Sequence, residues 1–241
     1  MKLGIIAAGK GSRLRLEGID TPKPLLPIRG VPMIERIIRV AVRCGFTDIS
    51  CVVNEQIASR CSYLVTEYSS ESVRFSLTVQ STPSSLHSFA MLAPRLMGGD
   101  FCLTTTDSVF SEAEFNRYLF RARRYREGDG LLAITRYIDD ENPLYARINR
   151  QKRITGFSSV PSASEWVTGG LYYFSPRVLE MIGPALENGT ERLRNFLQLL
   201  LDYKFQLFGF PFARIIDVDH ASDIAAAEDL LSDEHYSSVD P

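Results

Sequence analysis

Hydrophobic and polar positions alternate along the first half of the chain in a pattern that predicts repeated strand–helix units. Residues 3–7 form an unbroken apolar run, which is typical of a strand buried on both faces of a sheet. In residues 32–44 the apolar side chains recur at helical spacing, and charged side chains take the opposite face. The pattern continues with expected strands at 48–53, 73–79, 101–106 and 131–135 and expected helices at 55–68, 84–97 and 111–125. This alternation predicts an α/β fold with a parallel sheet and helices on both faces.

Local signals refine this pattern. Ser111, followed three residues later by Glu114, forms a capping box that predicts the start of a helix. Pro94 is expected to interrupt its helix near the end. From residue 139 the pattern is less regular, with expected strands at 145–148 and 170–174 and expected helices at 176–182, 191–201 and 223–231. Neither a repeat nor a linker interrupts the chain, so we predict one domain over residues 1–234 and a loose polar tail over 235–241.

The composition is that of an ordinary globular protein. Of the 241 residues, 45% are hydrophobic and 23% are charged, which excludes a disordered, collagen-like or coiled-coil chain. The apolar runs are all too short to span a membrane, and the N-terminus is typical of a first strand rather than a signal peptide.

Charge and cysteine usage narrow the partners further. The formal charge is 27 − 29 = −2, so no overall field favours nucleic acid or an anionic membrane. Because the chain has no overall basicity, the arginines of the helix at 111–125 are expected to form a solvated face or a contact within a homo-oligomer. The four cysteines show no CxxC spacing, so we expect buried thiols in a cytoplasmic protein.

A glycine-rich segment, Ala-Ala-Gly-Lys-Gly-Ser-Arg-Leu at 7–14, follows the first strand. Such loops let backbone N–H groups approach phosphates. A Walker A loop would need Ser or Thr after the lysine, where Gly11 stands, and would place Gly4 in the loop rather than in the strand. A dinucleotide-binding fingerprint would need glycine in place of Leu14. Both motifs are therefore excluded.

The wider segment 3–39 resembles the nucleotidyltransferase superfamily that includes the sugar-1-phosphate nucleotidyltransferases. The resemblance rests on the glycine-rich loop and on the block Pro-Lys-Pro-Leu-Leu-Pro at 22–27, at the spacing that this family uses. It implies a single-domain, Rossmann-like three-layer sandwich with a mostly parallel mixed sheet. It also implies transfer of a nucleoside monophosphate from a triphosphate to a phosphorylated small molecule, with release of pyrophosphate.

The resemblance also implies roles for particular residues in binding the triphosphate. Nucleotide-binding positions of the first segment are expected at Ala7, Ala8, Gly9, Gly11, Ser12, Arg13 and Lys23. Arg13 and Lys23 are the expected catalytic residues, because phosphoryl transfer depends on cations positioned around the phosphates. The segment 79–86 is similar to the family's base-binding segment, in which Gln80 would pair with the edge of the base. Ser85 stands where that family uses glycine, and its side chain narrows the expected pocket.

Two aspartates map to the family's Mg²⁺ ligands. Asp107 follows the strand at 101–106, at the sheet edge where open α/β sheets bind ligands. Asp217 belongs to a segment near the C-terminus that resembles the family's closing motif. Separated carboxylates suit Mg²⁺, which keeps waters and bridges phosphates, whereas the scattered His and Cys residues do not have zinc-ligand spacing. Asp219 remains either a secondary ligand or a helix-entry acceptor, and the role of His220 is open.

The expected acceptor site lies in the segment 167–174, which is similar to a family strand that approaches the acceptor sugar. Thr168, Gly169 and Gly170 are its candidate residues. Two other acceptor-side landmarks, at 145–147 and 157–161, depart from the family pattern. A sugar 1-phosphate is therefore the expected acceptor, and a non-sugar phosphate such as phosphocholine, a phosphonate or a cofactor phosphate is the alternative. The remaining alternative for the whole chain is a non-catalytic nucleotide or sugar-phosphate sensor on the same scaffold.

Overall fold

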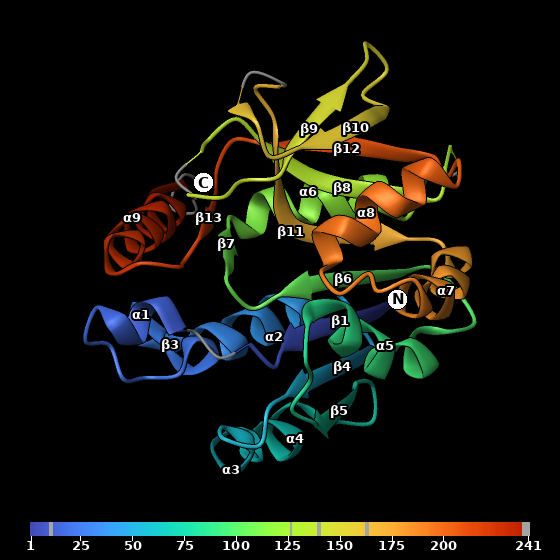
Figure 1. The fold of residues 1–241 in the computed structure, drawn as a ribbon. Helices are drawn as coiled ribbons and strands as arrows, with labels where there is room; N and C mark the ends of the chain where they lie inside the picture. Colours follow the sequence, from blue (N-terminus) through green and yellow to red (C-terminus); the bar gives the residue numbers. More distant parts are fainter. Residues whose placement is uncertain (10–11, 126, 139–140, 162–163, 238–241) are drawn as a thin grey trace.

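The computed structural model of the chain describes residues 1–9, 12–125, 127–138, 141–161 and 164–237. Its centre is a mixed sheet in which the neighbouring strands β5, β4, β1 and β6 run parallel to one another (Figure 1). The strands of this sheet are β1 (Lys2–Ala7), β4 (Asp48–Val53), β5 (Arg74–Val79), β6 (Phe101–Thr105), β8 (Gly130–Thr135), β9 (Tyr145–Ile148), β10 (Ile154–Ser158), β11 (Val167–Phe174) and β12 (Leu207–Phe212). The strand β11 is antiparallel to β6, β8 and β9, and it joins the parallel half to the remaining strands.

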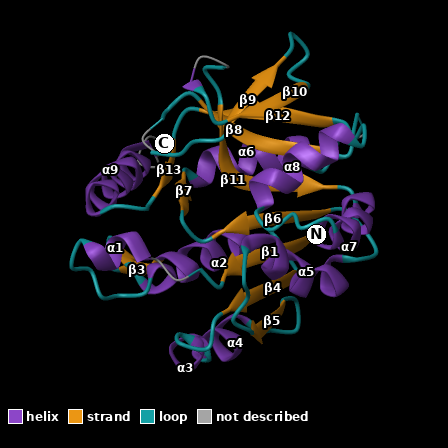
Figure 2. Cartoon of the chain, viewed as in Figure 1, coloured by secondary structure: helices purple, strands orange, loops and turns teal. Residues whose placement is uncertain are grey.

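Helices cover both faces of the sheet, so the fold is the expected three-layer sandwich (Figure 2). One face packs against α2 (Met33–Arg43), α3 (Ala58–Cys61), α4 (Tyr63–Tyr68) and α6 (Glu112–Ala122), and the other against α5 (Ser85–Leu96), α7 (Ile182–Glu187) and α8 (Leu193–Asp202). Because side chains alternate along a strand, Leu3 and Ile5 of β1 point to the first face and Ile6 points to the second. Each fully buried aliphatic side chain of this kind contributes roughly 1.5–3 kcal/mol of transfer free energy.

A smaller unit lies beside the carboxyl ends of β1 and β6. It contains α1 (Ser12–Leu16), the 3₁₀ turn η1 (Lys23–Leu25), the ribbons β2 (Pro27–Ile28) with β3 (Val31–Pro32) and β7 (Ser108–Phe110) with β13 (Ile215–Asp217), and α9 (Ala221–Ser237). Its own apolar cluster includes Leu14, Val109, Val218 and Ala227. Segments from the first and last parts of the chain, residues 12–32 and 215–237, therefore lie together beside the sheet edge at which α/β proteins bind their ligands (Figure 1).

Most of the predicted elements are confirmed, and β4 and β9 have the predicted bounds. The capping box is confirmed as well, because the Ser111 hydroxyl accepts the Glu114 backbone N–H at 3.4 Å. The predicted helix at 55–68 was wrong as a single element, since α3 and α4 are separate and the backbone turns before Ala58. The segment predicted at 176–182 is the 3₁₀ helix η3 (Pro176–Met181), which continues into α7.

Two helices differ from their predictions near the C-terminal end. Pro94 does not interrupt α5, which continues to Leu96 with that side chain fully buried. The ammonium of Lys2 also donates to the Arg95 carbonyl at 2.9 Å and so stabilises this last turn. The closing helix α9 continues past the predicted end at residue 231 to Ser237 and includes the first three residues of the segment expected as a tail.

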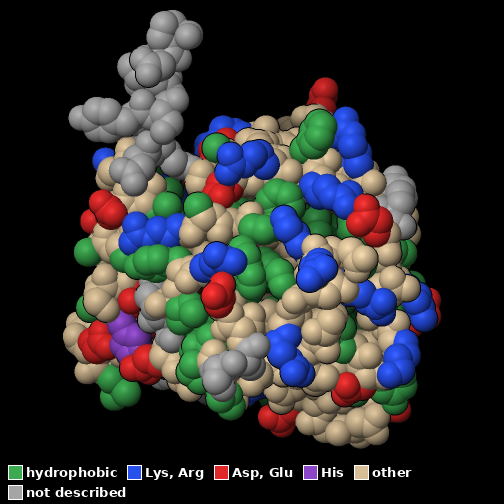
Figure 3. Space-filling view, turned by 90° about the horizontal axis from the view of Figure 1, so that it is seen from above, with side chains coloured by type: hydrophobic (Ala, Val, Ile, Leu, Met, Phe, Trp, Pro, Cys, Tyr) green, Lys and Arg blue, Asp and Glu red, His purple; other side chains and the backbone are tan. Residues whose placement is uncertain are grey.

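Charged side chains are distributed over the surface rather than concentrated. On the face seen in Figure 3, Lys and Arg side chains are separated from one another by apolar and uncharged ones. Among the helices of the described residues, none has the length and apolar character required to cross a bilayer.

Candidate active site

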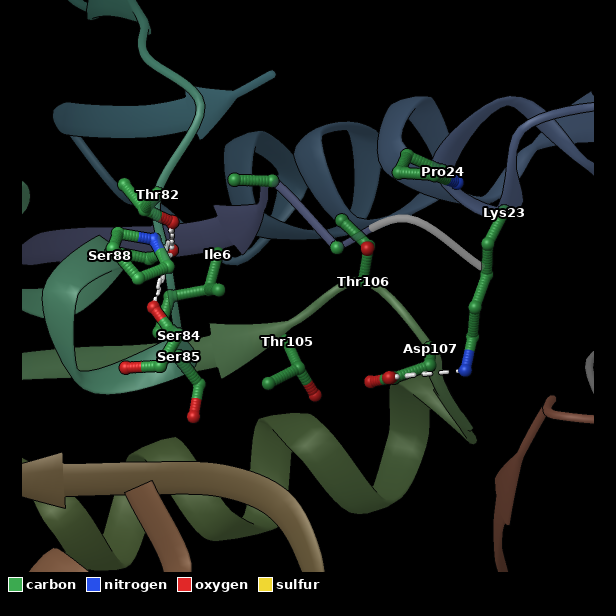
Figure 4. Close-up of a pocket in the computed structure, with 13 residues that line it drawn as sticks. Ile6, Lys23, Pro24, Thr82, Ser84, Ser85, Ser88, Thr105, Thr106 and Asp107 are labelled. Carbon is green, nitrogen blue, oxygen red and sulfur yellow. Dashed lines mark hydrogen bonds and ion pairs between the residues drawn. The ribbon is translucent and has the colours of Figure 1, made fainter. Parts of the chain in front are cut away.

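A cavity of about 370 Å³ opens at the carboxyl ends of β1 and β6. It is lined by Ile6, Ala8, Gly9, Lys23, Pro24, Thr82, Pro83, Ser84, Ser85, Ser88, Thr105, Thr106 and Asp107. Figure 4 shows that Lys23 and Asp107 lie at one end of this cavity and that Ser84 and Ser85 lie at the other. Residues from four segments of the sequence thus meet in one pocket.

The glycine-rich loop forms one wall of the cavity through its backbone. Ala8 and Gly9 line it, whereas Ala7 is a buried strand residue. Buried Asn54, which the sequence analysis missed, holds the loop because its Nδ2 lies 3.3 Å from the Ala8 carbonyl oxygen and 3.4 Å from that of Gly9. A side chain on Gly9 would project into open space, so nothing in the protein blocks the approach of a ligand there. Gly11 lies outside the described residues.

Lys23 is the central cation of the site. Its ammonium lies 3.1 Å from Asp107, 3.8 Å from Asp217 and 2.5 Å from Asp219. Only 11% of its side chain is exposed. Burial alone would lower the pKa of Lys23, but the three carboxylates outweigh that effect and raise it above its ordinary value. Lys23 is therefore fully charged at neutral pH.

Local backbone geometry places Lys23 in this position. Pro22 and Pro24 flank it and restrict the backbone, and Lys23 begins the turn η1, which the Leu25 N–H closes on the Pro22 carbonyl at 2.8 Å. Leu25 and Leu26 are buried next to it and anchor the turn in the core. The lysine is thus held by a rigid segment, as its sequence block suggested.

The two predicted metal ligands are neighbours in space. Asp217 of β13 pairs with Ser108 of β7, and the Val218 N–H donates to the Asp107 carbonyl at 3.0 Å. Desolvation raises the pKa of Asp107, but Lys23, the Thr105 hydroxyl and a backbone N–H outweigh it and hold that pKa below its ordinary value. Asp107 is therefore an ionised carboxylate, and it lies with Asp217 around a cation, the Lys23 ammonium.

This oxygen donor set fits a hard cation with few protein ligands. Two carboxylates from different strands, both partly accessible, suit Mg²⁺ because that ion keeps several of its waters. Among the residues that the structure describes, no three His, Cys, Asp or Glu side chains are grouped as a metal cluster. The residues present therefore fit a hard cation, and Mg²⁺ stays a prediction.

Arg13 reaches the same cluster from the other side. Its guanidinium contacts Asp219, which also accepts the hydrogen bond from Lys23. Asp223 fixes the backbone here, because its carboxylate accepts the N–H groups of Asp219 at 2.8 Å and His220 at 2.6 Å. Asp219 therefore joins the two expected catalytic cations, a role that the sequence analysis did not predict.

The expected base-binding residues divide into two groups. Ser85 lines the cavity, but its hydroxyl accepts the Leu193 N–H at 2.9 Å and so connects α5 to α8. Gln80 is exposed and is not among the lining residues. Thr82 and Ser88, which the sequence analysis missed, line the wall and lie 2.6 Å apart through their hydroxyls. The position of Thr82 in the loop between β5 and α5 was the available signal, whereas Ser88 in the first turn of α5 gave none.

A second, smaller cavity adjoins the cluster on the β11 side. It is lined by Thr135, Tyr137, Ile138, Pro143, Val167, Thr168, Gly169, Ile215 and Asp217. The expected acceptor residues Thr168 and Gly169 are here, but Gly170 is not. A Cβ at Gly170, whose φ is +67°, would collide with the Ser108 hydroxyl, so this glycine lets β11 pass close to β7.

Comparison with known proteins agrees with this geometry. The family model described as nucleotidyl transferase matches residues 3–229. The chain belongs to this nucleotidyl transferase family. It is 26% identical over 183 residues to a glucose-1-phosphate thymidylyltransferase from Neisseria meningitidis, covering 75% of this chain and 63% of that protein. It is 28% identical over 222 residues to a mannose-1-phosphate guanyltransferase from Hypocrea jecorina, covering 87% of this chain and 59% of that protein. The chain thus spans about three-fifths of these curated relatives.

Solved structures of other nucleotidyltransferases share the fold. The inositol-1-phosphate CTP transferase from T. maritima superposes with a TM-score of 0.82 at 19% identity, covering 100% of this chain and 98% of that one. A putative glucose-1-phosphate thymidylyltransferase from Bacillus anthracis gives a TM-score of 0.81 at 21% identity, covering 97% and 96%. At these identities the likeness shows the fold, which is the expected three-layer α/β type.

Proposed function

We propose that this chain transfers a nucleoside monophosphate from a nucleoside triphosphate to a sugar 1-phosphate and releases pyrophosphate. The observation that carries this proposal is the cluster in which Lys23 lies between Asp107, Asp217 and Asp219 at the edge of a nucleotide-sized cavity. Membership of the nucleotidyl transferase family and the names of the curated relatives support it.

In this proposal the triphosphate occupies the larger cavity. The backbone of Ala8 and Gly9 approaches its phosphates, and Lys23 and Arg13 leave Asp219 to contact phosphate oxygens. An oxygen of the acceptor phosphate attacks the α-phosphorus, and the bond from that phosphorus to the bridging oxygen breaks as pyrophosphate leaves. No general base is needed, because the acceptor phosphate is already an anion. The cations stabilise the charge on the transferring and leaving phosphates.

We assign Mg²⁺ as the cofactor of this reaction, with Asp107 and Asp217 as the residues that would hold it. When bound, the ion supplies charge screening and orientation of the phosphates. Asp217 also lines the smaller cavity, so it would face the acceptor as well as the metal. Lys23 must give up both carboxylates when the ion is present, and the phosphates offer it new partners.

We place the acceptor next to Thr168 and Gly169, at the mouth of the smaller cavity, whose volume of about 30 Å³ holds only a small part of such a molecule. The cavity combines the apolar side chains of Ile138, Pro143, Val167 and Ile215 with the polar ones of Thr135, Tyr137, Thr168 and Asp217. Transfer to a non-sugar phosphate by the same chemistry is the second candidate function, because the segments at 145–147 and 157–161 depart from the family pattern. A cytoplasmic location remains a prediction that rests on the four buried free cysteines, and a homo-oligomer remains open.

Pyrophosphate release tests the proposal. CTP, UTP, dTTP, GTP and ATP are each incubated with Mg²⁺ and either a pool of sugar 1-phosphates or a pool of other phosphorylated acceptors. Release that depends on one triphosphate and on the sugar pool supports the main proposal, and dependence on the other pool supports the second candidate. Triphosphate binding without release from any pool would contradict catalysis and indicate a sensor. The Asp107→Asn variant, folded as judged by its thermal unfolding, should show no turnover.

A further inference from the structure

The carboxylate of Glu17 holds the turn that leads into α9. One of its oxygens lies 2.5 Å from Nδ1 of His220, and the other accepts the backbone N–H of Ala221 at 2.7 Å. Ala221 is the first residue of α9, so Glu17 also satisfies a free N–H group at a helix start. The contact joins two segments that lie about 200 positions apart in the sequence.

Glu17 stands one helical turn after Arg13. Its backbone N–H lies 3.2 Å from the Arg13 carbonyl, so both side chains project from the same side of α1. Arg13 contacts Asp219 and Glu17 contacts His220 and Ala221, so α1 meets a single turn of the chain through two adjacent contacts. We call the Glu17–His220–Ala221 contact the clamp.

The helix that carries Arg13 needs such a contact. It has five residues, which is far too short to be stable alone. Leu14 is its buried apolar anchor, whereas Leu16 is 88% exposed and adds nothing. Directly after it, Gly18 adopts a φ of +85°, so the chain reverses there instead of extending the helix. The clamp is therefore the main polar restraint on α1 among the described residues.

The two contacts differ in what the substrate does to them. In the proposed reaction the triphosphate takes Arg13 from Asp219, which removes the first contact. Like Arg13, neither Glu17 nor His220 lines the cavity, but Arg13 shares Asp219 with Lys23, which does line it. We therefore expect the clamp to persist while Arg13 changes partner. An arginine that reorients on an unrestrained helix would lose the geometry that phosphoryl transfer requires.

We propose that Glu17 and His220 are positioning residues that hold α1 in place, so that Arg13 reaches the triphosphate. This inference rests on the proposed function, because Arg13 acts on a nucleotide only there. Other charged groups around His220 are Glu141, 3.5 Å from Nε2, and Asp223, which binds the His220 backbone N–H. Glu141 belongs to the β8–β9 connection and carries no part of the site, so it provides a matched control.

A double-mutant cycle between Glu17→Gln and Arg13→Gln tests the clamp. Glu17→Gln alone should raise the KM for the triphosphate about tenfold and leave the KM for the acceptor unchanged. In the Arg13→Gln background the same change should cost less than about twofold, because the clamp then has no arginine to position. Glu141→Gln, which removes the other carboxylate facing His220, should leave both KM values within about twofold of wild type.

Equal costs of Glu17→Gln in both backgrounds would overturn the proposal and assign Glu17 a general structural role. No cost in either background would also overturn it. Glu17→Asp keeps the negative charge, so it distinguishes loss of the clamp from a folding defect confined to Glu17→Gln. Its KM for the triphosphate should lie closer to the wild-type value than that of Glu17→Gln. Hydrogen exchange of amides 12–17 should be faster in Glu17→Gln without any substrate. That measurement tests the clamp without any catalytic assay. Absence of turnover in the wild-type protein would refute the proposed function and leave the test of the clamp intact.

Discussion

The ammonium of Lys23 lies 2.5 Å from a carboxylate oxygen of Asp219, a residue from the opposite end of the chain. The same carboxylate contacts Arg13, so one aspartate pairs with both cations that are proposed to bind the triphosphate. Together with Asp107 and Asp217, Asp219 surrounds Lys23 with negative charge before any substrate arrives. The resting site is thus an internally compensated cluster, and ligands must exchange with its internal partners.

Removing the Lys23 charge should open the carboxylates to a metal. In Lys23→Met, Asp107 and Asp217 lose their internal cation and repel one another, so Mn²⁺ should bind about tenfold more tightly without nucleotide than it does to wild type. Turnover should fall in the same variant. Titration followed by Mn²⁺ electron paramagnetic resonance measures the affinity. The double variant Lys23→Met/Asp107→Asn should lose the gain; equal Mn²⁺ affinity of Lys23→Met and wild type would refute competition between the lysine and the metal.

The Asp219→Asn variant tests whether Asp219 competes with the triphosphate or is the secondary metal ligand that the sequence left open. If Asp219 competes with the triphosphate for Arg13 and Lys23, removal of its charge should lower the Kd of the triphosphate several-fold, by roughly 1 kcal/mol or less for partly exposed pairs. Isothermal titration without metal measures this. A weaker binding that appears only in the presence of Mg²⁺ would instead identify Asp219 as a secondary ligand. Asp229→Asn, whose carboxylate pairs with Arg214 away from the cluster, serves as the control.

Sequence motifs predicted the parts of the site that are encoded locally. The glycine-rich loop, Lys23 and Asp107 each follow a strand or a proline-restricted turn, so their positions depend on a few neighbouring residues. The second carboxylate, Asp217, was found because its closing motif resembles that of a family. The α/β fold with helices on both faces of the sheet was predictable from local sequence as well, because apolar periodicity records which face of each element is buried.

Contacts between distant segments could not be predicted. The contact of Asn54 with the loop depends on the pairing of β1 with β4. Asp219 between two cations and the Glu17–His220 pair depend on how residues 12–32 meet residues 215–237. Single polar residues of this kind leave no periodic signal. The continuation of α5 through Pro94 was missed because burial of Leu96 and the Lys2 contact stabilise the last turn from outside the helix.

The pH dependence of the clamp follows from its two titrating groups. The hydrogen bond to Glu17 raises the pKa of His220 above its ordinary value of 6.5, with Glu141 and Asp223 adding to the rise. The Ala221 N–H and His220 lower the pKa of Glu17. The contact of protonated His220 with Glu17 therefore stabilises the fold fully below a pH of about 6.5, and this stabilisation is lost as the pH rises through the folded-state pKa of His220. The KM for the triphosphate should therefore increase across that upper range in wild type.

The His220→Gln variant is the control for this titration. It should have a higher KM at pH 6 and should lack the wild-type rise above that pH, because the group that titrates is gone. Glu17 limits the range on the acid side, where the clamp weakens only below the ordinary carboxyl pKa of 4.5. Parallel profiles of KM in both proteins between pH 5.5 and 8.5 would contradict the assignment to His220.

Two glycines should respond oppositely to alanine. Gly170 has a positive φ, and a Cβ there would collide with the Ser108 hydroxyl and lie 2.8 Å from the Thr105 hydroxyl oxygen. Gly170→Ala should therefore destabilise the protein by about 2–4 kcal/mol, from backbone strain plus overpacking. Gly99 lies between α5 and β6 without a positive φ, and a Cβ there would meet no described atom within 4 Å apart from its chain neighbours, so Gly99→Ala should be neutral or stabilise by up to about 1 kcal/mol. Urea unfolding of both variants measures the difference, and Gly170→Ala with wild-type stability would show that β11 does not need glycine to pass β7.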